Sequence, residues 1–241
     1  MAVTALGVDT VLPAYGDIRE SLGLDENATE VTGLITFYLM GNSLGLLPAG
    51  LLSDRYGRKV VMWGGLALYV VGAIGSIFAP TLGWMFVARF VWGVGGAGPR
   101  VAAMAAIRDR FEGEQMAKQM SFLMAIFLLV PAVGPTISAG ILAVGPWQAV
   151  FWMCAVAAVV VALLVVRLPE TLTVEARRPL AVRDALASYR IVLTTPGMLL
   201  YLLSLTALFG AFLSYLASSE LIVDQTFDLE RWFPAFFGGL A

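Results

Sequence analysis

In Gly50-Leu51-Leu52-Ser53-Asp54-Arg55-Tyr56-Gly57-Arg58-Lys59, a short charged stretch separates two long apolar runs. Val31 to Leu52 and Val60 to Gly83 contain no charged residue. A bilayer core requires about 20 apolar residues per helix, so both runs are predicted to span a membrane. The stretch between them is then a tight turn between antiparallel helices. Gly57 suits a turn that requires positive φ, and Gly50 allows close approach of another backbone.

The whole decapeptide resembles the signature that follows the second helix of the major facilitator superfamily. That signature is a glycine, two variable residues and a small residue, followed by Asp-Arg, a variable residue and Gly-Arg-Arg/Lys. The alternative is an ordinary cytoplasmic loop, since such loops collect lysine and arginine. In the family the turn is a conformational latch and not a substrate site. The resemblance carries this role to Gly50, Asp54, Arg55, Gly57, Arg58 and Lys59.

Composition places the chain among polytopic membrane proteins, because 59% of its residues are apolar and 13% are charged. It contains no histidine and one cysteine, Cys154, which lies in an apolar run. Histidine-based catalysis and a disulfide framework are therefore excluded, no metal site or cofactor is expected, and a proton carrier must be a carboxylate. The sequence contains no phosphate-binding loop, so ATP-driven transport is not expected. It also contains no basic patch interleaved with aromatic residues that would indicate nucleic-acid binding.

The apolar runs divide the chain into three parts. Residues 1–170 are predicted to hold six transmembrane helices, 171–195 a polar cytoplasmic linker, and 196–241 the start of a second bundle. The resemblance implies an all-α facilitator fold in which each six-helix half is a 3+3 inverted repeat. It also implies that a C-terminal bundle is missing, although a true seven-helix protein is an alternative. The expected helices cover residues 1–16 (truncated), 31–52, 60–83, 84–107, 119–143, 147–166 and 196–217, with an eighth beginning at Trp232.

Positive charges are concentrated on one side of this arrangement. Eleven of the 15 lysines and arginines fall in the loops that follow the second, fourth and sixth helices. By the positive-inside rule, the N-terminus and the linker after the sixth helix are predicted to lie in the cytoplasm. The expected location is the inner or plasma membrane.

Asp9 is the acidic residue placed inside the first predicted helix. A charge within hydrocarbon costs roughly 2.5–3.5 kcal/mol on insertion scales, so it requires an explanation. Asp9 is either close to a frayed helix end or faces a water-filled cavity, where a carboxyl group could bind and release a proton. The stretch Asp9-Thr10-Val11-Leu12-Pro13 resembles the first-helix signature of drug:proton antiporters, which implies the second role.

Two arginines lie in the fourth predicted helix, Arg89 and Arg100. Eleven residues at 100° each place them on one helix face, ~16 Å apart along the axis, and this face is expected to look into the bundle. Arg89 could instead extend to the outer interface. The glycines at 93, 95, 96 and 98 are expected to allow close helix packing. The stretch resembles the family motif whose arginine is implicated in proton transfer. This implies a coupling role for Arg89, although Trp92 replaces the usual glutamine; for Arg100 the argument is mainly positional.

The fifth predicted helix contains two prolines and two glycines within ten residues. Prolines remove backbone hydrogen bonds, so a simple bend is one interpretation. The stretch also resembles the antiporter motif Pro-x-x-Gly-Pro-x-x-Gly-Gly, which separates exporters from importers and uniporters. The corresponding residues are taken as Pro131, Gly134, Pro135 and Gly140, with Ala139 in place of a glycine.

In the second helix, Tyr38, Asn42, Gly45 and Ala49 are spaced to share one face. Asn42 is expected to form an interhelical hydrogen bond or to contact substrate, and Tyr38 and Asn42 are both candidates for residues that face the cavity.

Together these resemblances point to the drug:proton antiporter branch, most similar to the bicyclomycin/chloramphenicol-resistance group. They imply efflux of small drug-like or amphipathic molecules, driven by protons, with the lipid bilayer as surroundings. The alternatives are an exporter of an endogenous metabolite, a seven-helix receptor or channel, an inactive half-transporter, or a membrane enzyme. The last is disfavoured because the spans lack histidine and contain one acidic residue.

Overall fold

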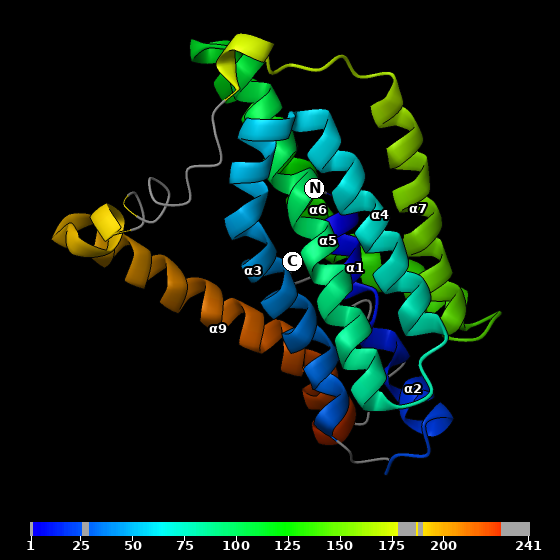
Figure 1. Cartoon of the computed structure of the whole chain (residues 1–241). Helices are drawn as coiled ribbons and strands as arrows, with labels where there is room; N and C mark the ends of the chain where they lie inside the picture. The colour runs from blue at the N-terminus through cyan, green and yellow to red at the C-terminus, as the bar shows by residue number, and fades with distance from the viewer. Residues whose placement is uncertain (1, 26–28, 178–186, 188–189, 228–241) are drawn as a thin grey trace.

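The structure is a computed structural model that describes residues 2–25, 29–177, 187 and 190–227. All regular secondary structure within these residues is helical. Helices α3 (Gly33–Tyr56), α4 (Arg58–Ile77), α5 (Leu82–Arg110), α6 (Gly113–Leu142) and α7 (Gln148–Val166) stand side by side around α1 (Ala2–Asp9), as Figure 1 shows. The predicted all-α bundle is confirmed.

The first helix is broken inside the bundle. After α1 ends at Asp9, a 3-10 turn (Leu12–Ala14, η1) leads into α2 (Tyr15–Ser21). Pro13 lacks an N–H, and its ring would clash in a helix with the carbonyl four residues earlier, which belongs to Asp9. The helix therefore ends at the residue that the sequence marks as a proton carrier.

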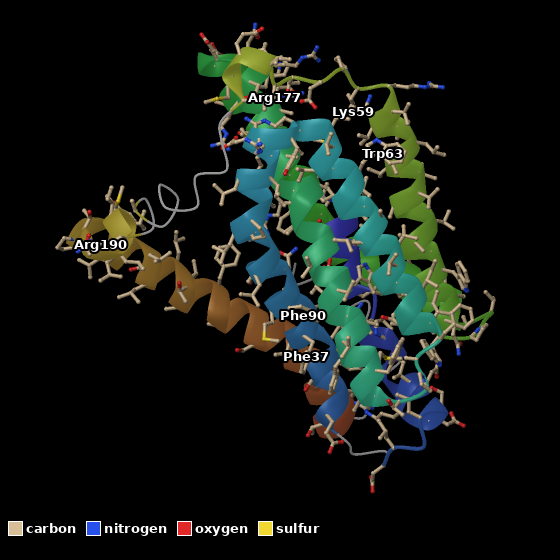
Figure 2. All side chains as sticks on the ribbon, in the orientation of Figure 1. Phe37, Lys59, Trp63, Phe90, Arg177 and Arg190 are labelled. Carbon is tan, nitrogen blue, oxygen red and sulfur yellow. The ribbon has the colours of Figure 1, made fainter. Side chains whose placement is uncertain are left out.

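The membrane character is visible in the described helices. Four of them have the length and apolar composition to cross a bilayer, namely α3 together with its leading 3-10 turn η2 (Thr29–Thr32), α4, α5 and α7. Their outer faces expose large apolar side chains such as Val71, Trp84 and Val87, and Trp63 projects from α4 in Figure 2. A surface of this kind is suited to lipid.

The α3–α4 turn is as tight as predicted. Tyr56 ends α3, Arg58 begins α4, and Gly57 between them has φ 107°. This backbone conformation is unfavourable for residues that carry a Cβ, and the expected need for glycine is therefore confirmed.

Close packing of α5 depends on its glycines. A Cβ on Gly93 would collide with the backbone oxygen of Tyr38 on α3, and one on Gly95 would collide with the backbone of Tyr69 on α4. The predicted close approach along α5 is confirmed. At Gly50 no atom of the described chain lies within 4 Å of a Cβ built there, so close approach at this glycine stays a prediction.

Several helix ends differ from their expected positions. α6 begins at Gly113, before the expected residue 119, because the charged Glu114 and Lys118 are exposed and continue the helix beyond the apolar run. α9 (Pro196–Phe227) continues past the expected end at Ala217. The linker contains a 3-10 turn, η3 (Val174–Ala176), and its residues 178–186 and 188–189 lie outside the described residues, as does the predicted eighth helix at Trp232. The three-part division of the chain stays a prediction.

α9 extends away from the bundle at a steep angle (Figure 1). Apolar side chains along it, including Leu200, Tyr201 and Leu208, are largely exposed. The core of the described chain is formed instead mainly by α1, α3, α4, α5 and α7. Within it, the Trp92 ring on α5 packs against aromatic rings from α3, α4 and α7.

Candidate functional site

The backbone of α1 is held by hydroxyl groups from neighbouring helices. The Tyr38 hydroxyl donates to the Thr4 carbonyl (2.8 Å), and the Tyr69 hydroxyl donates to the Val3 carbonyl (2.6 Å). The Thr4 hydroxyl in turn donates to the Gly96 carbonyl on α5 (3.0 Å). These bonds tie α1 to α3, α4 and α5 just before its break, so they fix where Asp9 lies.

Arg89 binds the broken end of α1. Its Nη1 donates to the Gly7 carbonyl (3.0 Å) and its Nε to the Leu34 carbonyl (3.4 Å). Gly7 belongs to the last turn of α1, where carbonyls lack helical partners and a cation is favoured. The Arg89 side chain is fully buried, so extension to the outer interface is excluded in this structure.

An aromatic cage encloses the Arg89 guanidinium. Its Cζ lies 4.8 Å from the ring centre of Trp92, and the Tyr38 and Phe151 rings lie at 5.3 and 5.4 Å. Trp92 also packs edge-on against Tyr69 and Phe151, with ring centres 5.3 Å apart in each pair. Where the family has a glutamine, this chain therefore supplies cation–π stabilisation of the arginine.

Asp9 is buried at the end of α1, with 1% of its surface exposed. It is therefore not part of a frayed, exposed end. Its Oδ1 atom has no hydrogen-bond partner among the described residues. On α6, a Cβ built on Gly134 would lie 3.7 Å from the Cβ of Asp9. The structure thus brings together two separate sequence predictions, the carboxylate of the first helix and a glycine of the antiporter motif.

The rest of the α6 motif is distributed unevenly. Pro135 is buried beside Gly134, whereas Gly140 is exposed, and the side chain of Pro131 lies outside the described residues. Counting the pattern from Pro131 puts the paired glycines at 138 and 139, so the assignment of Gly140 is corrected. Ser138, which is fully buried, stands where the motif has a glycine.

Arg100 does not share the surroundings of Arg89. It is partly buried, and its Cζ lies 5.2 Å from the ring centre of Phe127 on α6. Arg89 faces α1, so the two arginines contact different helices. A coupling role for Arg100 stays a prediction.

Tyr38 and Asn42 lie in the helix interface, together with the Gly45 and Ala49 positions of the same face. The Asn42 amide donates to the Gly93 carbonyl on α5 (3.2 Å). Both side chains are buried and bonded to backbone carbonyls, so this geometry supports the interhelical role of Asn42. Contact of either residue with a cavity stays a prediction.

At the α3–α4 turn, Arg58 connects two acidic residues. Its Nη1 donates to Asp54 Oδ1 and to Ser53 Oγ (3.0 Å), and its Nε donates to Asp109 Oδ2 at the end of α5 (2.9 Å). The Arg58 side chain is mostly buried, whereas 44% of the Asp54 side chain is exposed. Asp54 can therefore reach a further partner while Arg58 is held in place.

Glu170 caps the start of α4. Its carboxylate accepts hydrogen bonds from the backbone N–H groups of Arg58 (3.0 Å) and Lys59 (3.1 Å). Partial desolvation opposes ionisation, but hydrogen bonds from backbone N–H groups outweigh it and hold the pKa of the Glu170 carboxyl below its ordinary value. No role was predicted from the sequence for Glu170 or for Asp109, whose Oδ2 also accepts a hydrogen bond from the Thr171 hydroxyl (3.0 Å).

The remaining residues of the turn make local contacts. The Lys59 ammonium donates to the Val166 carbonyl at the end of α7 (2.7 Å), and the Arg55 guanidinium lies over the ring of Tyr56. Beside them, a cavity of about 290 Å³ is lined by Met62, Phe111 and Leu168, among others. Within the described chain, no group of three His, Cys, Asp or Glu side chains could hold a metal.

We expect Glu170→Gln to lower stability mainly at neutral pH. Because the folded-state pKa of Glu170 lies below its unfolded value, its contribution is present above the unfolded pKa and is lost as pH falls through the folded pKa. Losing a helix cap costs about 1 kcal/mol. Thermal unfolding in detergent should therefore separate wild type from Glu170→Gln at pH 7 and bring them together in acid. Glu175→Gln, at an exposed position, is the control, and an equal loss there would contradict the cap.

We expect Gly57→Val to disturb the turn strongly. A Cβ at this position would lie 2.5 Å from Glu170 Oε2, and the positive φ adds strain of about 1–3 kcal/mol. For a latch at this turn, turnover in transport assays of the complete gene product should fall while substrate affinity is kept. Gly64→Val on α4 is the matched control, because a Cβ there meets no atom within 4 Å. Normal turnover in Gly57→Val would contradict a latch at this turn.

Comparison with known proteins agrees with this geometry. The family model of the Major Facilitator Superfamily matches residues 1–241. The chain belongs to this superfamily. Similar solved structures include the human organic anion transporter MFSD10 (TETRAN), with a TM-score of 0.61 and 21% identity over 83% of this chain and 52% of that one. The inward-open xylose transporter XylE from E. coli has a TM-score of 0.56 and 16% identity over 81% and 54% of the two chains. At these identities the structures show the fold.

Curated relatives within the superfamily include transporters named for drug resistance. A bicyclomycin resistance protein homolog of Haemophilus influenzae is 28% identical over 217 residues, which are 90% of this chain and 54% of the relative. Multidrug resistance protein MdtL of Escherichia coli O81 is 34% identical over 145 residues, which are 59% of this chain and 37% of the relative. The chain thus spans about half the length of the bicyclomycin resistance homolog. Membership places the chain among integral membrane proteins, and four of its described helices are long and apolar enough to cross a bilayer.

Proposed function

We propose that this chain forms the N-terminal bundle and the start of the C-terminal bundle of a proton-coupled exporter of small drug-like or amphipathic compounds. The observation that carries the proposal is the buried carboxylate of Asp9, which lies against Gly134 at the break of the first helix. Ionisable side chains within membrane segments mark ion pathways, and this one meets a residue of the antiporter motif. The names of the drug-resistance relatives support the same substrate class.

The proposed mechanism is alternating access, powered by the proton gradient and without a bound cofactor or a catalytic step. A proton from the outside neutralises Asp9 and competes with substrate from the cytoplasm for the central cavity. The two bundles rock, and the substrate leaves on the outside. In this proposal the α3–α4 turn lies in the cytoplasm of the inner or plasma membrane, together with the N-terminus and the linker, and half-exposed Asp54 contacts the C-terminal bundle.

The exposed apolar surface of α9 favours the proposal that a second bundle packs against this helix. Its side chains have few partners in the described chain, although a helix of this composition is stable in a membrane against lipid or other helices. We therefore propose that α9 packs against further helices of the C-terminal half, which completes the cavity wall for substrate.

The proposal is tested with the complete gene product, produced in a bacterium that lacks its own drug exporters. Cells that contain it should accumulate less ethidium and less bicyclomycin than control cells, and a protonophore should remove the difference. If neither compound is exported but a metabolite of the cell is, the protein belongs instead to the class of metabolite exporters. Export that survives the protonophore would contradict proton coupling.

A further inference from the structure

Ser138 is a buried hydroxyl that the antiporter motif does not supply. The motif has a glycine at this position, whereas this chain has a serine with no exposed surface. The Ser138 Oγ atom has no hydrogen-bond partner among the described residues. Buried polar groups in proteins are nearly always hydrogen-bonded, so a side chain of this kind requires an explanation.

The position of Ser138 relates it to Asp9. Gly134 and Ser138 are four residues apart and therefore lie on one face of α6, one turn from each other. Gly134 packs against the Cβ of Asp9, and neither Asp9 Oδ1 nor Ser138 Oγ, both buried, has a hydrogen-bond partner in the part of the chain that the structure describes. In an alternating bundle α1 and α6 run in the same direction. Along α6, Ser138 lies ~6 Å beyond Gly134 in the direction away from Gly113, the first residue of the helix.

We propose that Ser138 and Asp9 share one buried water molecule, and that this bridge sets the pH at which Asp9 releases its proton. The inference rests on the proposed function, because it concerns the same carboxylate. Asp9 contacts Gly134, and Ser138 lies one helix turn from that glycine, so the two buried polar groups can serve as partners for a water molecule, which usually needs two to four. The water accepts a hydrogen bond from Ser138 and donates one to the carboxylate, so the ionised form of Asp9 is stabilised. Ser138 is thus a positioning residue.

Other titratable groups lie near this part of α1, and none among the described residues is hydrogen-bonded to Asp9 Oδ1. The Arg89 guanidinium binds the Gly7 carbonyl, and α6 has no ionisable side chain between residues 119 and 142. The hydroxyl groups of Tyr38 and Tyr69 donate to backbone carbonyls. The Cys154 thiol on α7 lies 3.5 Å from the Thr10 hydroxyl, and Tyr15 follows the break.

The test is an infrared titration of the complete gene product in lipid vesicles, which requires no substrate. The carboxylic acid band that disappears in Asp9→Asn reports protonation of Asp9. In Ser138→Ala the midpoint of this band should rise by about one pH unit, because a hydrogen bond to the ionised form is lost. Ser138→Thr keeps the hydroxyl and should keep the wild-type midpoint. Thr136→Ala, at an exposed position of the same helix, is the matched control.

The outcomes separate the two proposals. A Ser138→Ala midpoint equal to that of wild type, with the Asp9 band present, overturns the water bridge and leaves proton coupling by Asp9 intact. If Asp9→Asn removes no titrating band, Asp9 binds no proton in this range and both proposals fail. If the band shifts in Ser138→Ala but Asp9→Asn still couples transport to protons, the bridge stands and the proposed function fails.

Discussion

Asp9→Asn should reduce substrate-driven proton movement to the background of empty vesicles. Asparagine has nearly the same shape as aspartate, but its amide group does not bind or release a proton near neutral pH. Because Asp9 is 99% buried, replacing it by a neutral group also removes a desolvation cost, so the variant should fold and express at least as well as wild type. The loss is therefore expected in coupling and not in stability.

The matched control for this variant is Asp17→Asn. Asp17 lies in α2 after the break and is exposed, so its removal should change neither coupling nor stability. Proton movement would be measured with a pH-sensitive dye inside vesicles after addition of ethidium. Coupling that is lost equally in both variants would contradict a specific role for Asp9.

Arg89→Ala should cause the largest loss of stability among the substitutions considered. It removes the hydrogen bonds to the Gly7 and Leu34 carbonyls and leaves a hole among the rings of Trp92 and Phe151. Large-to-small changes in a core cost about 2–5 kcal/mol, and an unpaired buried carbonyl adds to this cost. With the end of α1 released, Asp9 should also lose its fixed position, so transport should become uncoupled.

Arg100→Ala is the control for stability on the same helix, because Arg100 is only partly buried and, among the described residues, its guanidinium lies over the ring of Phe127. Thermal unfolding and proton coupling would be measured side by side. Arg89→Ala is expected to be markedly less stable than Arg100→Ala and to lose coupling. Wild-type efflux and wild-type stability in Arg89→Ala would show that the buried guanidinium has neither role.

Local sequence patterns predicted the parts of the fold that depend on neighbouring residues. The tight turn at Gly57, its positive φ and the close packing at Gly93 and Gly95 each follow from the properties of residues near in sequence. Pro13 likewise signals the break after Asp9, although the first helix was predicted only to be truncated. The break could have been predicted, because a proline ring clashes with the carbonyl four residues earlier, here that of Asp9.

The contacts that the sequence did not reveal join distant segments. Glu170 caps α4 from a position more than a hundred residues away, and Asp109 meets Arg58 because the ends of α3 and α5 lie together. A charge pattern gives no information on which acid meets which base. The same holds for the aromatic cage of Arg89, since Phe151 comes from α7. Ser138 could have been found from the sequence, because it stands at a glycine position of the antiporter motif when the motif is counted from Pro131.

The most direct test of proton-coupled export uses the purified complete gene product in vesicles with an acidic interior. Addition of ethidium outside should make the interior more alkaline as protons leave in exchange for the dye. A protonophore should abolish the exchange, and Asp9→Asn vesicles should show none. Ethidium uptake without any proton movement, or equal proton movement in Asp9→Asn, would contradict the account.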